Sequence, residues 1–156
     1  MSTQQRIYLT AKENIGETAW AKKNKRQARR KENVCFNQGE WKCNLFVYEV
    51  IYAAGKDIGT PNKLNGWGHP ILAMQNKLDR PPCAKDWFNE EVSAAKYIGE
   101  GDNGRKKCEQ GDIITDGTHM GIVAGNKKTI SAGEYEVVHN DWGFRGENVK
   151  IFRIKE

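Results

Sequence analysis

The sequence predicts an α+β domain in which N-terminal helices pack on a C-terminal antiparallel β-sheet. Two patterns indicate this class: residues 43–55 repeat apolar side chains at helical spacing, and residues 111–154 carry short strand-like runs separated by turns. A hydrophobic fraction of 38% with 16 glycines favours a loop-rich α+β protein over a helical bundle. A chain of 156 residues is long enough for one domain with its own hydrophobic core and too short for two, so we expect a single domain over 1–156.

The predicted helix begins at Cys43 and ends at Gly55. Its apolar face is formed by residues at i, i+3, i+4, i+7 and i+11, namely Cys43, Phe46, Val47, Val50 and Ala54. Free N–H groups and the macrodipole at a helix start favour a thiolate, whereas burial on the apolar face opposes it. A second group must then polarise the thiol, and histidine is the usual one. The alternative is that Cys43 is a small buried hydrophobe.

His119 opens the next informative run. Residues 111–118 read as a short strand and a glycine-containing turn, so His119 lies where the following strand begins. Residues 125–128 then read as a hairpin turn into a further strand over 129–132. This pattern predicts a β-meander with one imidazole at its rim. The alternative is a solvated histidine without a chemical role.

The order of three motifs resembles the papain-like cell-wall cysteine peptidases of the NlpC family and their CHAP amidase relatives. The motifs are Cys-Asn-Leu-Phe-Val from Cys43, Gly-Asp-Ile-Ile from Gly111 and His-Met-Gly-Ile-Val from His119, within a resemblance that covers about residues 35 to 154. Gln110 stands where the family often has proline. The resemblance implies a papain-like fold, Cys43 as nucleophile and His119 as base. It also implies a polar residue on a following strand that orients the histidine.

Several side chains compete for this orienting role. Pairing across the predicted hairpin puts Ser131 roughly opposite His119, where many NlpC enzymes carry another histidine. A serine hydroxyl orients an imidazole less well than an amide or a carboxylate does. The run 137–144 offers three further candidates: His139, Asn140 and Asp141. Strand alternation places His139 and Asp141 on one face, and we favour Asp141 because a carboxylate stabilises the imidazolium.

Residues 56–110 form a loop-rich region that, by the resemblance, walls the cleft. Four prolines interrupt it, and short helices are predicted over 71–78 and 87–95. Three tryptophans are candidates to line the cleft: Trp67, Trp87 and Trp142. We expect substrate contacts from Trp67, Trp142 and His139, although core packing is the commoner fate of tryptophan.

The N-terminal residues 1–34 are expected to hold a first helix and a basic segment. Thr10 and Glu13 have capping-box spacing, so the helix is predicted to begin at Thr10 and to run toward a block at 22–31 with seven basic residues in ten. The chain carries 25 basic and 20 acidic side chains, a net charge of +5. The block has three possible uses: a solvated face, which we favour, attraction to anionic envelope polymers, or contact with nucleic acid, which we favour least.

The four cysteines form no CxxC pair, and no zinc-ligand spacing is present. We therefore expect no metal and no organic cofactor. If Cys43 stays free, Cys83 and Cys108 either form a bridge or remain free thiols, of which we favour the second. The state of Cys35 stays open.

Together these features predict a peptidoglycan hydrolase. By the resemblance, the substrate is an amide bond of the stem peptide, cut by an endopeptidase or an N-acetylmuramoyl-L-alanine amidase. The expected partners are peptidoglycan and, for a secreted antibacterial effector, an immunity protein. Two rivals remain: an acyltransferase that uses the same thiol and imidazole, and a noncatalytic basic binding module.

Residues 1–6 lack a secretory h-region, and no run approaches the 18 apolar residues of a membrane span. We therefore expect no secretory signal. On this expectation the protein is made in the cytoplasm and reaches the periplasm or cell wall by non-Sec export or by lysis, as a phage lysin or a contact-dependent effector would.

Overall fold

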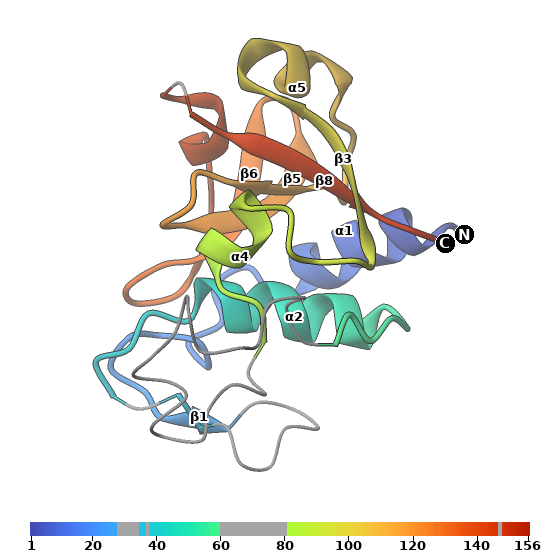
Figure 1. Ribbon diagram of the computed structural model, residues 1–156. Coiled ribbons are helices and arrows are strands. Elements are labelled where there is room, and N and C mark those ends of the chain that lie inside the picture. Colours follow the sequence, from blue (N-terminus) through green and yellow to red (C-terminus); the bar gives the residue numbers. More distant parts are fainter. Residues whose placement is uncertain (28–34, 37, 60–80, 147) are drawn as a thin grey trace.

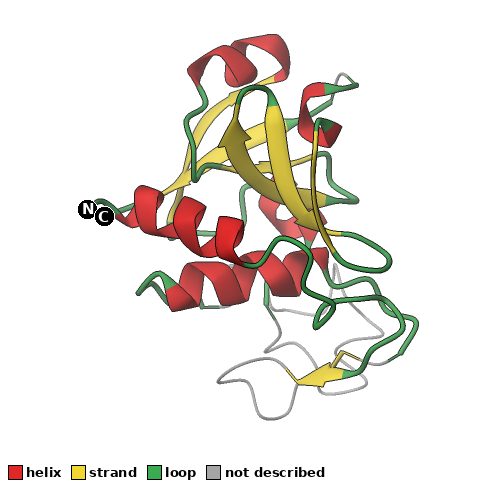
Figure 2. Ribbon diagram, turned by 180° about the vertical axis from the view of Figure 1, so that it is seen from behind, coloured by secondary structure: helices red, strands yellow, loops and turns green. Residues whose placement is uncertain are grey.

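A computed structural model describes residues 1–27, 35–36, 38–59, 81–146 and 148–156, and these form an α+β fold, which confirms the predicted class. A six-stranded antiparallel sheet carries helices α1 (Thr3–Glu13) and α2 (Cys43–Ala53) on one face, as Figures 1 and 2 show. The main core lies between this face and the two helices. Within the described residues, no helix has the length and apolarity that crossing a membrane demands.

The sheet has the strand order β3-β8-β4-β5-β6-β7, and every neighbouring pair is antiparallel. Its strands are β3 (Ala95–Glu100), β4 (Ile113–Thr115), β5 (Met120–Gly125), β6 (Lys128–Ala132), β7 (Val137–Asn140) and β8 (Lys150–Ile154). The predicted strand over 149–154 is therefore confirmed, and it lies inside the sheet between β3 and β4. A separate pair joins β1 (Arg26–Gln27) to β2 (Cys35–Phe36).

The second face of the sheet has its own small cluster. Its buried members are Ile114, Val123, Val149 and Ile151. Helix α5 (Gly101–Lys107) and the 3-10 turn η1 (Trp142–Phe144) cover it, and Arg105 Nε of α5 donates to the Gly143 carbonyl at 3.2 Å. Helix α4 (Ala84–Phe88) lies beside β4.

Helix α2 is buried along most of its length. All residues from Cys43 to Ile51 are buried, so the helix is enclosed on more than the one face that its spacing predicts. It packs on α1, β5 and β6. The predicted stop is confirmed, because Gly55 has φ +100° and donates its N–H to the Tyr52 carbonyl at 2.9 Å.

The hairpin turn predicted at 125–128 is confirmed. Asn126 and Lys127 both have positive φ, at 52° and 56°, the conformation of a two-residue turn that suits the twist of antiparallel strands. It joins β5 to β6 and thereby carries the histidine motif and Ser131 on adjacent strands.

Three sequence predictions are wrong. Helix α1 ends at Glu13 instead of beginning at Thr10, because the capping box that forms is Ser2 with Gln5. The helix predicted over 87–95 is replaced by α4, which ends at Phe88, and by the start of β3. The strand predicted over 137–144 stops at Asn140, where the chain turns into η1. The helix predicted over 71–78 lies outside the described residues.

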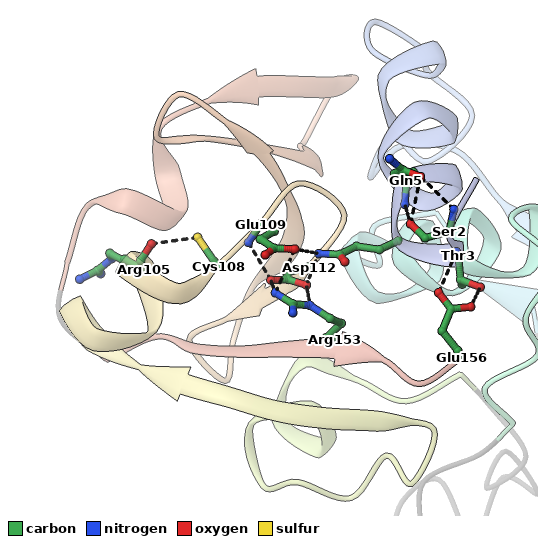
Figure 3. A network of polar contacts seen from close by, with 10 residues as sticks. Ser2, Thr3, Gln5, Arg105, Cys108, Glu109, Asp112, Arg153 and Glu156 are labelled. Atoms are coloured by element: carbon green, nitrogen blue, oxygen red, sulfur yellow. Dashed lines mark hydrogen bonds and ion pairs between the residues drawn. The ribbon is translucent and has the colours of Figure 1, made fainter.

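A buried carboxylate links α1 to the sheet (Figure 3). Asp112 is fully buried and accepts from Arg153 at 2.7 and 2.8 Å, which joins the segment before β4 to β8. The same carboxylate accepts from Gln4 Nε2 of α1 at 2.9 Å and from the Glu109 N–H at 2.8 Å. The Gly-Asp motif therefore has a structural role here.

Candidate active site

Cys43 is the first residue of α2, and its side chain is only 6% exposed. Burial raises the pKa of the thiol to about 11, although hydrogen bonding by the backbone N–H groups of Met120, Asn44 and Cys43 itself works in the opposite direction. Met120 directly follows His119. The structure thus brings the thiol against the first residue of β5, the strand that His119 precedes.

A buried lysine fixes the backbone immediately before the thiol. Lys42 is 1% exposed, and its Nζ donates to the carbonyls of Ala21, Lys22 and Glu40 at 3.2, 3.3 and 2.8 Å. A buried ammonium is tolerated only when it is hydrogen-bonded, so these contacts hold two loop segments together. The start of α2 is rigidly placed as a result.

His119 is half-buried and has two close neighbours. Its Nε2 lies 3.2 Å from the Ser131 Oγ, and its ring meets Trp142 edge to face with centroids 4.5 Å apart. Burial lowers the pKa of His119, and the charge of Asp116 opposes that shift. Within the described part of the chain, Nδ1 makes no hydrogen bond, and Nε2 is the ring nitrogen that contacts Ser131.

A glycine lets the serine reach the imidazole. Side chains alternate along a strand, so positions 119 and 121 point to the same face of the sheet. A Cβ on Gly121 would lie 3.0 Å from the Ser131 Cβ and 2.9 Å from the Ile130 carbonyl oxygen. The absence of a side chain at Gly121 therefore leaves the space across which Ser131 contacts His119.

The turn before His119 is held by Asp116. Its Oδ1 accepts from the backbone N–H groups of Thr118 and His119 at 2.9 and 2.8 Å. Burial by itself would raise the pKa of Asp116, but these N–H donors outweigh it, so the pKa is lowered and the carboxylate stays charged. Asp116 fixes the position of the histidine backbone and supplies the charge that raises the histidine pKa.

The segment from Pro81 to Ala84 closes one side of the site. The Asn44 amide donates to the Pro81 carbonyl at 3.5 Å, beside the nucleophile position. The Thr115 Oγ1 lies 3.2 Å from the Ala84 carbonyl oxygen and 2.9 Å from that of His119. Asn44, which follows Cys43, and Thr115, which binds the His119 carbonyl, thus contact the same short segment at the start of α4.

The other predicted site residues fall in different places. Asp141 is half-exposed and pairs with Arg145 at 3.0 Å, so the His119 ring is contacted by Ser131 where we expected Asp141. His139 is exposed and pairs with Ile130, whose side chain faces the helices, whereas Ser131 points to the opposite face. The Trp142 ring contacts the His119 ring edge to face. Trp67 lies outside the described residues. Trp87 is buried against Phe152 in the core and lines no cleft.

Asp116 and Lys42 were not predicted as parts of the site. The Asp-Gly-Thr sequence before His119 is the signal for the first, because an aspartate in a turn accepts from N–H groups two and three residues on. Lys42 has no comparable signal, since nothing in its neighbours reveals that a lysine there would be buried.

Cys43, Cys83 and Cys108 are free thiols, so the possible Cys83–Cys108 bridge is not formed. Cys108 donates instead to the Arg105 carbonyl at 3.0 Å. Among the residues that the structure describes, no three His, Cys, Asp or Glu side chains gather as a metal site requires.

The fold and the site together define an α+β protein in which a buried cysteine at the start of a helix lies against the backbone of Met120, the residue that follows His119 at the start of a central strand. Comparisons with protein-family models, with curated proteins and with solved structures find no match.

Proposed function

We propose that this protein is a papain-like cysteine hydrolase that cleaves an amide bond in the stem peptide of peptidoglycan. The observation that supports it best is the position of the Cys43 thiol, at a helix start and against the Met120 N–H, one residue from a histidine whose Nε2 is held by Ser131. Nucleophile, base and orienting group are the three parts that this chemistry needs.

In the proposed mechanism, the Nε2–H of His119 donates to Ser131, which leaves the lone pair of Nδ1 to take the thiol proton. The Cys43 sulfur then attacks the amide carbonyl. The N–H groups of Cys43, Asn44 and Met120, which already surround the sulfur, stabilise the negative charge that develops as the proton leaves. His119 next protonates the leaving amine and activates the water that hydrolyses the thioester.

The residues themselves support a thiol acyl-transfer site, and the motif resemblance supports peptidoglycan as its substrate class. Within that class, we propose either endopeptidase or N-acetylmuramoyl-L-alanine amidase activity. The protein would act where its substrate lies, at the cell wall.

The test is the digestion of purified sacculi, with the released fragments identified by mass. We expect the wild type to release muropeptides or free stem peptides and Cys43→Ala to release none. Cys108→Ala is the matched control, because it removes a thiol whose hydrogen bond lies in the loop after α5, and its products should equal those of the wild type. Identical products from wild type and Cys43→Ala would overturn the proposal, and the fragment masses identify the bond that is cut.

A further inference from the structure

Three chain segments meet beside the nucleophile. The Lys22 N–H donates to the Glu134 carbonyl at 2.9 Å, and the Gly39 N–H donates to the Lys22 carbonyl at 2.7 Å. The buried Lys42 ammonium binds this same Lys22 carbonyl and that of Glu40. In Figure 1 they meet where the orange turn between β6 and β7 approaches the blue and teal loops that precede α2.

This junction carries exposed aromatic surface. Trp41, two residues before Cys43, is 51% exposed although its backbone neighbour Lys42 is buried. The Lys22 Nζ lies 4.6 Å from the centre of the Trp41 ring. Tyr135, the residue after Glu134 of this junction, is 71% exposed. The backbone contacts of the junction position the main chain that carries these side chains, and the side chains themselves lie outside the core.

We propose that Trp41 and Lys22 form a binding subsite for the glycan chain to which the stem peptide is attached. This inference rests on the proposed function and deepens it: the protein selects stems that still carry their sugars over free stem peptides. The apolar C–H face of an amino sugar packs on the exposed indole, and the Lys22 ammonium pairs with a carboxylate of the stem.

The rigid junction makes Trp41 suited to this role. An aromatic side chain has only two torsions, so it loses little conformational entropy on binding. Lys22 is also the first residue of the basic block over 22–31, and its ammonium attracts an anionic wall polymer. Tyr135 adds a second exposed aromatic side chain to the junction.

Binding is measured in the Cys43→Ala background by sedimentation with purified sacculi, which needs no turnover. We expect Trp41→Ala to weaken binding about tenfold, as the loss of a central aromatic contact does, and Trp41→Phe to retain most of it. Lys22→Gln should weaken binding and reduce its dependence on salt. Tyr97→Ala is the matched control, because Tyr97 is an exposed aromatic residue on β3 at the far edge of the sheet, and it should bind as its parent does.

A second readout is the ratio of kcat/KM on sacculi to kcat/KM on a short soluble substrate that contains the bond cut in the sacculus digest, a free stem peptide for an endopeptidase or a single muramoyl peptide for an amidase. It should fall about tenfold in Trp41→Ala and stay constant in Tyr97→Ala. Binding that is equal in Trp41→Ala and its parent, or a ratio that does not change, overturns the subsite. Failure of the wild type to cut either substrate overturns the proposed function instead, and the sedimentation result then still decides whether Trp41 binds the wall.

Discussion

At the scale of the residue, the Cys43 thiol and the His119 imidazole are both neutral near pH 7. Burial raises the pKa of the Cys43 thiol to about 11 and lowers the pKa of the His119 imidazole, so neither group ionises near pH 7. Under the proposed mechanism, the three N–H groups around the sulfur are therefore preorganised for a charge that appears only during the reaction. This arrangement favours a general-base mechanism over a standing thiolate–imidazolium pair.

The charge of Asp116 sets how far the His119 pKa is lowered. Because Asp116 stabilises the imidazolium, Asp116→Asn should lower the titration midpoint of His119 further below 6.5, as followed by the imidazole C2–H signal in NMR. The direction in which stability changes with pH follows from this shift. Because the pKa of His119 is lower in the folded protein than in the unfolded chain, the unfolded chain takes up the proton first as pH falls. The contribution of His119 to stability is thus lost as pH falls through 6.5 toward the folded pKa.

Asp141→Asn is the matched control for this titration, because Asp141 pairs with Arg145 on the half-exposed turn after β7. We expect it to leave the His119 midpoint unchanged. A shift with Asp141→Asn and none with Asp116→Asn would return the orienting role to Asp141 and contradict the assignment of that charge to the turn before His119.

At the scale of the element, the sequence predicts what local signals determine. The helix from Cys43, its stop at Gly55 and the hairpin around 125–128 each follow from spacing or turn chemistry within a dozen residues. The start of α1 was missed because two capping boxes compete. Ser2 with Gln5 wins because that register buries Ile7 and Ala11 against α2, whereas Ile15 remains exposed.

Strand β3 was missed for a different reason. Its side chains do not alternate between buried and exposed, since only Gly99 of its six residues is buried. Its pairing with β8 joins positions that are 50 or more residues apart in sequence. The contact of Ser131 with His119 likewise depends on strand register and on the space at Gly121. Asp141 was favoured on the assumption that the strand from Val137 continues, and the chain turns instead.

Gly111, two residues before β4, sets how closely α1 approaches the sheet. Gly111 has φ +92°, and a Cβ there would lie 2.0 Å from the Gln4 carbonyl oxygen. Gly111→Ala should lower the free energy of unfolding by about 3 kcal/mol or more, because positive-φ strain adds to the displacement of α1. Gly55→Ala is the control, since Gly55 has φ +100° and open space around its Cβ position, and it should cost only about 1 kcal/mol.

Urea unfolding at constant m-value measures both changes. The difference between the two variants isolates the contact with Gln4 from the backbone conformation that both glycines share. Equal losses in the two variants would mean that α1 moves away at no cost, and that its position is not set by this contact.

At the scale of the whole molecule, both ends of the chain are fastened to the sheet next to each other. The Thr3 side chain donates to the Glu156 carboxylate at 2.9 Å, and Asp112 joins α1 to β8 through Gln4 and Arg153. These contacts are the ones that Figure 3 draws around the Asp112 carboxylate and the chain termini. Helix α1 in turn packs on α2, so the network supports the helix that begins at Cys43 from a distance.

This network yields a prediction about coupling. Asp112 is fully buried, so Arg153→Met leaves its charge without the bidentate partner and should destabilise the protein by about 3 to 5 kcal/mol. Asp112→Asn in the same chain removes that charge, and because the remaining amide still accepts from Gln4, the double variant should be more stable than Arg153→Met alone. A double-mutant cycle of unfolding free energies gives the coupling, and additive losses would show that the pair contributes to the fold only as two independent side chains.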